Sequence, residues 1–84
     1  MSPSIFWCHR LTSVHSPDYR ALLRRLQDAR RRAGLTQEQV ARSLRKPQSY
    51  VSKCETGERR IDVIELKRFA VLYGVSVDQL LGLS

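Results

Sequence analysis

The segment from Gln48 to Thr56 holds the densest set of side chains that could do chemistry. Turning an α-helix by about 100° per residue places its amide, hydroxyl and ammonium groups within one arc. The members of this arc are Gln48, Ser49, Ser52, Lys53 and Thr56. Such groups match the hydrogen-bond donors and acceptors on base edges in the DNA major groove, which admits one α-helix. The pattern therefore fits base recognition, and it also fits the polar exterior of an ordinary surface helix.

Basic residues are concentrated around this segment. The chain has 15 Lys and Arg against 8 Asp and Glu, a formal net charge of +7, and 12 of the basic but only 4 of the acidic residues fall within 19–60. Regional positive charge favours a polyanion, either nucleic acid or an anionic membrane surface, although a solvated basic face gives the same count. The candidate phosphate contacts are Gln37, Arg42, Lys46, Arg59 and Arg60, and Arg45 borders the same turn.

The sequence gives little support for metal binding, redox chemistry or catalysis. His9 and His15 have no acidic or cysteine companions at ligand spacing, and Cys8 and Cys54 form neither a CxxC pair nor a disulfide framework. Cys54 fits a small buried hydrophobe better than a redox sensor. No nucleophile, base and orienting group converge, and no Gly-rich phosphate loop is present. We therefore expect no enzyme activity, no cofactor and no metal.

The length of 84 residues indicates one domain. No apolar run is long enough to span a membrane, and the N-terminus lacks the pattern of a secretory signal, so we expect a soluble cytoplasmic protein. Residues 1–15 show no clear periodicity and are interpreted as an N-terminal arm, with residues 16–84 as the folded domain.

Five helices and no strand are expected in that domain. The first begins at Ser16-Pro17-Asp18 and ends before Gly34. Three later helices start at capping boxes, Thr36 with Gln39, Asp62 with Glu65 and Ser76 with Gln79, and another spans 48–55. The expected apolar faces comprise Leu22, Leu23, Leu26, Ala29, Ala33, Leu35, Val40, Ala41, Leu44, Tyr50, Val51, Cys54, Val63, Leu66, Phe69, Ala70, Tyr73, Val77, Leu80 and Leu81.

Arg30 shares the helical stripe of Leu22 and Leu26, which predicts that its side chain points inward. An unpaired buried charge costs several kcal/mol, on the order of 3 to 5. We therefore expect Arg30 to have a carboxylate partner.

Two runs, from Gly34 to Leu44 and from Pro47 to Asp62, resemble the helix-turn-helix domain of the phage repressor and Cro family, also called the XRE family. The resemblance covers about residues 19–82 and implies a compact, all-α, five-helix lambda-repressor-like domain. It implies base contacts from Gln48, Ser49, Ser52 and Lys53, with Gln37 bracing Gln48 and touching phosphate. It further implies that Tyr50 and Thr56 are phosphate or packing residues and that Arg30 pairs with Glu55.

Two residues depart from the family pattern. Arg45 stands where the family usually has the glycine of the turn, so either that position tolerates a side chain or the turn differs. Pro47 replaces the usual Ser or Thr cap, and we expect the following helix to survive this change.

The function implied is sequence-specific binding of double-stranded DNA by a small transcriptional regulator, as a homodimer on a pseudo-palindromic site. The alternative is an antitoxin or a protein-interaction module of the same fold, whose main partner is another protein. The arm segment Ile5-Phe6-Trp7 either packs on its own domain or, with or without the apolar edge of the last helix, adds to a subunit interface.

Overall fold

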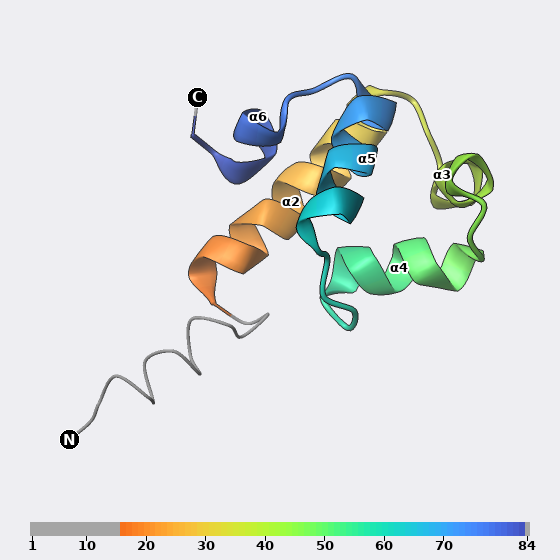
Figure 1. The fold of residues 1–84 in the computed structure, drawn as a ribbon, viewed down its shortest axis with the longest axis horizontal. Helices are drawn as coiled ribbons and strands as arrows, with labels where there is room; N and C mark the ends of the chain where they lie inside the picture. Colours follow the sequence, from red (N-terminus) through yellow and green to blue (C-terminus); the bar gives the residue numbers. More distant parts are fainter. Residues whose placement is uncertain (1–15, 84) are drawn as a thin grey trace.

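The computed structural model describes residues 16–83, and the N-terminal arm expected over 1–15 lies outside them. Within 16–83 the chain forms helices and connecting turns and no strand, as expected of an all-α domain (Figure 1). The helices are α2 (Pro17–Arg32), α3 (Gln37–Leu44), α4 (Gln48–Thr56), α5 (Val63–Tyr73) and α6 (Val77–Leu81).

Local side-chain caps set the helix starts. The Ser16 hydroxyl accepts from the Tyr19 N–H at 3.2 Å, with Pro17 at the first helical position of α2. Both bonds of a capping box are present at the starts of α3, α5 and α6. Each box satisfies two backbone donors that a helix start otherwise leaves unpaired. Helix α4 has no such cap, because Pro47 offers no side-chain acceptor.

Each of the helices described here is followed by a residue with positive φ, directly in four cases and after Ala33 in the case of α2; in four of the five cases that residue is glycine. The exception is Arg45 after α3, with φ 58° and ψ 45°. The Lys46 N–H donates to the Ala41 carbonyl at 2.9 Å, and the Arg45 N–H to the Arg42 carbonyl at 3.2 Å. These bonds form the usual left-handed helix ending. Arg45 therefore takes the conformation of the missing glycine, and the turn is not altered.

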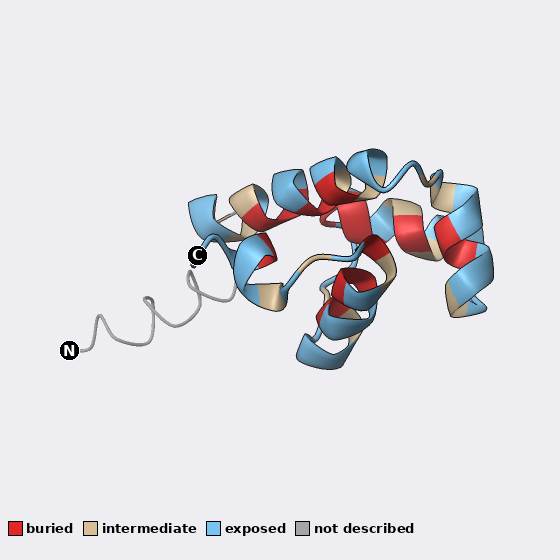
Figure 2. Ribbon diagram, turned by 90° about the horizontal axis from the view of Figure 1, so that it is seen from above, coloured by how far each residue is buried: buried red, intermediate tan, exposed pale blue. Residues whose placement is uncertain are grey.

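The core lies where α2 packs against α4, α5 and α6, and Figure 2 shows the buried segments facing this interior. Phe69, Leu26, Leu80, Val40 and Val51 are its largest fully buried side chains.

Three residues expected on the apolar faces are exposed. Val63 is 76% exposed because it is the first residue of α5, Ala33 lies beyond the last turn of α2, and Leu81, the last residue of α6, is 41% exposed.

Helices α3 and α4 form a helix-turn-helix. Residues 45–47 connect them, α3 packs mainly on α4, and α4 packs on α2. Figure 1 shows this pair at one side of the molecule, away from α6. None of the helices described here is long and apolar enough to cross a bilayer.

Candidate nucleic-acid interface

Helix α4 presents a polar face to the outside. Gln48, Ser49 and Lys53 are exposed and Ser52 is half-buried. On the opposite side Val51 and Cys54 are fully buried. The expected polar arc is therefore the outward one, held there by the core contacts of the other arc. Thr56 at the end of the helix is also exposed, and its hydroxyl donates to the Lys53 carbonyl at 3.3 Å.

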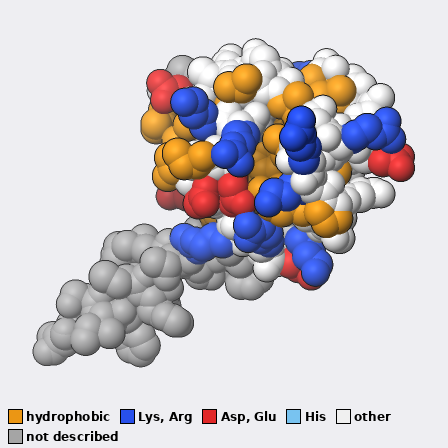
Figure 3. Space-filling view, turned by 45° about the vertical axis from the view of Figure 1, so that its right-hand side comes forward, with side chains coloured by type: hydrophobic (Ala, Val, Ile, Leu, Met, Phe, Trp, Pro, Cys, Tyr) orange, Lys and Arg blue, Asp and Glu red, His pale blue; other side chains and the backbone are white. Residues whose placement is uncertain are grey.

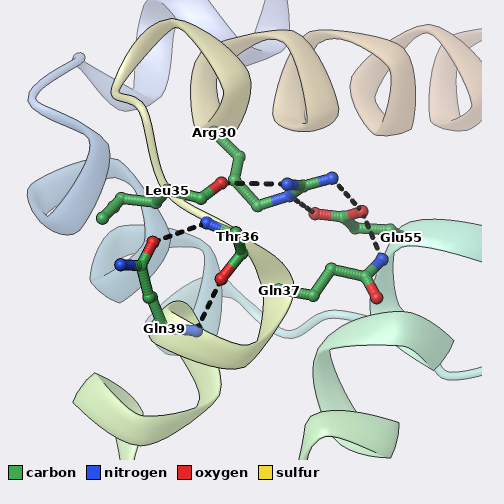
Figure 4. Close-up of polar contacts among 6 residues, drawn as sticks. All are labelled: Arg30, Leu35, Thr36, Gln37, Gln39 and Glu55. Atoms are coloured by element: carbon green, nitrogen blue, oxygen red, sulfur yellow. Dashed lines mark hydrogen bonds and ion pairs between the residues drawn. The ribbon is translucent and has the colours of Figure 1, made fainter.

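An ion pair ties this helix to α2 (Figure 4). Arg30 Nε donates to Glu55 Oε2 at 2.6 Å, and the second nitrogen, Nη2, donates to Glu55 Oε1 at 3.2 Å. The Glu55 side chain has no exposed surface and that of Arg30 is 12% exposed. Arg30 Nη1 also donates to the Leu35 carbonyl at 2.9 Å, just before α3. The inward arginine and its carboxylate partner are thus both present.

Gln37 has a different partner from the one expected. Its amide nitrogen donates to Glu55 Oε1 at 2.9 Å, so the side chain joins the ion pair instead of bracing Gln48 (Figure 4). The first residue of α3 is therefore fixed to α4 through Glu55. Because Gln37 is half-buried beside this pair, its position near the start of α3 is well defined.

Tyr50 is the centre of a basic cluster on the α5 side of α4. The Lys46 ammonium lies 5.3 Å and the Arg59 guanidinium 5.0 Å from its ring centroid, and Phe69 stacks on the ring at 6.4 Å. The Tyr50 hydroxyl donates to Glu65 Oε2 at 2.7 Å. Burial and this hydrogen bond to Glu65 raise the pKa of the Tyr50 hydroxyl, so it stays protonated.

Glu65 also pairs with Arg59, whose Nη2 lies 2.7 Å from Oε2. Burial acts to raise the pKa of Glu65, but hydrogen bonds from the Asp62 N–H, Tyr50 and Arg59 outweigh it and lower the pKa. Conversely, Glu65 raises the pKa of Arg59. The carboxylate is therefore charged at neutral pH and holds two of the residues expected to lie at a DNA backbone.

The loop after α4 is fixed by Tyr19 of α2. The Ile61 N–H donates to the Tyr19 hydroxyl at 2.9 Å, and the Arg60 guanidinium lies 5.5 Å from the Tyr19 ring centroid. A cation over an aromatic face is stabilised by the ring quadrupole. Tyr19 therefore places Arg60 beside the helix-turn-helix.

The surface around α3 and α4 is rich in cations. Figure 3 turns this side of the molecule forward and shows many Lys and Arg side chains, with fewer acidic ones. Arg42, Lys46, Arg59 and Arg60 are all exposed. Lys46 lies before α4 and the last two follow it, so basic groups flank the polar face at both ends. Such a surface attracts a polyanion and can hold phosphates on either side of a groove.

The described residues hold neither an exposed thiol nor a cluster of metal ligands. Cys54 is fully buried, and burial followed by the charge of Glu65 raises the pKa of its thiol, so it stays protonated and shielded from solvent. Among residues 16–83 no group of three or more His, Cys, Asp or Glu side chains could hold a metal ion.

Sequence reasoning missed the roles of Glu65 and Tyr19. The sequence pattern indicates Glu65 only as a capping residue and gives no role to Tyr19. One signal was present for Glu65: the other two capping boxes use glutamine, Gln39 and Gln79, which shows that a cap alone requires no charge. For Tyr19 no local signal exists, because its partner Ile61 is 42 residues away.

The arrangement of α3, the short turn and α4, with a polar outward face on the second helix, defines a helix-turn-helix protein, a class that binds DNA. Residues 21–82 match the family described as "Helix-turn-helix domain". A solved structure of an XRE-family like protein from Pseudomonas syringae pv. tomato str. DC3000 is 41% identical to the chain. The alignment covers 96% of this chain and 92% of that one, with a TM-score of 0.74. No curated protein sequence matches the chain. The chain belongs to the XRE-type helix-turn-helix family.

Proposed function

We propose that this protein is a sequence-specific transcriptional regulator, acting as a repressor, that inserts α4 into the major groove of double-stranded DNA. The observation that supports this most directly is the orientation of α4, whose polar side is outward while Val51 and Cys54 are fully buried. In this arrangement the base contacts come from Gln48, Ser49, Ser52 and Lys53. Glutamine suits adenine and lysine suits guanine.

Phosphate contacts on both sides of the groove would set the register of α4. We assign them to Gln37, Arg42, Lys46, Thr56, Arg59 and Arg60. The exposed cations among them flank α4, as a duplex with its two phosphate backbones requires. Tyr50 takes the packing role, because its hydroxyl proton is donated to Glu65 and its ring lies under the Arg59 guanidinium. The Gln37 amide donates to Glu55 at 2.9 Å. Any phosphate contact from this amide must therefore be made alongside that hydrogen bond.

The regulator acts as a homodimer on a pseudo-palindromic site in the cytoplasm. Two copies of α4 about 34 Å apart would meet successive major grooves on one side of the duplex. The C-terminal edge of the domain supplies apolar surface for pairing, because Leu81 is 41% and Leu83 is 72% exposed. No catalytic step, metal or cofactor belongs to this function.

The test is selection of binding sites from a randomised duplex pool at about physiological salt, where specific complexes survive and non-specific ones largely dissociate. We expect an inverted repeat with half-sites about one helical turn apart. Recovery of no sequence by the folded protein would contradict base recognition and favour the protein-interaction module.

Two variants then separate base contacts from phosphate contacts. Gln48→Ala should lower discrimination between the selected site and a mismatched one by about 1 to 3 kcal/mol, because a bidentate base contact is lost. Arg60→Ala should weaken all duplexes alike and reduce the salt slope by about 1. Equal losses on specific and random DNA for Gln48→Ala would remove Gln48 from the base contacts.

A further inference from the structure

Glu65 makes more contacts than its place in a capping box requires. Its Oε1 accepts the Asp62 N–H at 3.0 Å, which closes the box at the start of α5. Its Oε2 accepts from the Tyr50 hydroxyl and from Arg59 Nη2, both at 2.7 Å. One carboxylate thus joins the start of α5, the first turn of α4 and the loop between them.

The capping function alone does not call for a charge at this position. In α3 and α6 the same backbone bond is accepted by the amide oxygens of Gln39 at 2.9 Å and Gln79 at 2.8 Å. A glutamine at position 65 could accept the Asp62 N–H in the same way. What a glutamine amide cannot supply is the negative charge that holds the Arg59 guanidinium.

The geometry leaves Arg59 free to bind a further anion while Glu65 holds it. A guanidinium has five N–H donors, and Glu65 uses one of them on Nη2. The Arg59 side chain is 44% exposed, and the Tyr50 ring lies 5.0 Å from its guanidinium carbon. Tyr50 differs, because its single hydroxyl proton is donated to Glu65. Arg59 is therefore the member of this group that can donate to a phosphate, and Tyr50 is its platform.

We propose that Glu65 is a positioning residue for DNA backbone binding: with Tyr50 it fixes the Arg59 guanidinium at the end of α4, so that the remaining N–H groups meet one phosphate. This inference rests on the proposed function. Holding a long side chain in its bound geometry before DNA arrives removes part of the entropy cost of the contact. On this proposal, removing the charge of Glu65 weakens DNA binding. Simple electrostatics predicts the opposite, that removing a carboxylate near DNA strengthens binding.

The test uses the full chain and the duplex obtained by selection, with the dissociation constant measured as a function of salt. Glu65→Gln keeps the capping acceptor and removes the charge. We expect its Kd to rise about two- to fivefold, the range for losing an exposed ionic restraint. The magnitude of its salt slope should fall by up to about 0.9, the value for one phosphate contact, as Arg59→Ala should also show. In the Arg59→Ala background, Glu65→Gln should cause no further loss.

The matched control is Glu38→Gln, which removes an exposed carboxylate from the first turn of α3. It should leave binding unchanged or strengthen it. Urea unfolding measures the stability of each variant. If the role of Glu65 were purely structural, Glu65→Gln would change the stability and leave the salt slope unchanged.

Two results would overturn the inference while leaving DNA binding intact. One is unchanged or tighter DNA binding by Glu65→Gln. The other is an equal loss of affinity on Glu65→Gln in the unsubstituted protein and in the Arg59→Ala background. Absence of any salt-dependent binding by the unsubstituted protein would instead overturn the proposed function and this inference with it.

Discussion

At the scale of single residues, Arg45 is the position where backbone geometry and residue type disagree most. It adopts φ 58° at the end of α3, in the region that glycine occupies after the four other helices. The left-handed conformation costs a residue with a Cβ roughly 1 to 2 kcal/mol. The strained residue lies in the turn of the helix-turn-helix. Its conformation lowers the stability of the domain, and its basic side chain lies beside the proposed interface.

Arg45→Gly should therefore raise the free energy of unfolding by about 1 kcal/mol. The substitution relieves the backbone strain, and the greater freedom of glycine in the unfolded chain offsets part of that gain. Thermal unfolding would show this as an increase in Tm of about 4 to 8 °C for a domain of this size. The matched control is Gly74→Ala at φ +72°, where an added Cβ would meet nothing within 4 Å. It should lower stability by a similar amount, and a decrease with Arg45→Gly would contradict the strain.

At the scale of elements, the group formed by Arg30, Glu55 and Gln37 holds three helices in register. It joins α2 to α4 through the ion pair and α3 to α4 through the Gln37 amide (Figure 4). Because Glu55 is 3% exposed, its carboxylate oxygens are hydrogen-bonded by these partners in place of water. The relative placement of the two helices of the motif is thus decided by a buried polar contact as well as by apolar packing.

Arg30→Met should lower the free energy of unfolding by about 3 kcal/mol or more, since it leaves a buried carboxylate with one neutral donor. Arg31→Met, an exposed neighbour in the same helix, should change it by less than about 0.5 kcal/mol. Denaturant unfolding measures both. Adding Glu55→Gln to Arg30→Met should recover part of the loss, because the unpaired charge is removed. Equal stability of the two arginine variants would contradict a buried ion pair.

At the scale of the whole molecule, exposed apolar side chains lie on different elements. Leu81 and Leu83 form the C-terminal edge, whereas Val71 belongs to α5. Leu83 and Val71 are each 72% exposed, so exposure does not distinguish them. The proposed homodimer uses the C-terminal edge.

Leu83→Glu should shift the protein from dimer to monomer and weaken binding to a two-half-site duplex, because a charge enters an apolar contact. Val71→Glu, with the same exposure and the same new charge, should leave both properties unchanged. Sedimentation equilibrium over a range of concentrations gives the first property and duplex titration the second. Dissociation by Val71→Glu alone would move the interface to α5.

The amino-acid sequence by itself determined the helices and the outward face of α4. Their starts at Ser16, Thr36, Asp62 and Ser76 follow from bonds between residues three apart, which form within one turn whatever the rest of the chain does. The face of α4 follows from helical periodicity, which is equally local. The inward Arg30 followed from the same reasoning.

Only the tertiary structure decided which distant side chains share a partner. Gln37 contacts Glu55 across 18 residues, Tyr50 contacts Glu65 across 15, and Tyr19 contacts Ile61 across 42. It also left Val63, the first residue of α5, in solvent. A local pattern specifies what a side chain can bind. Which partner it meets depends on how α2, α4 and α5 pack, and that packing is set by the core as a whole.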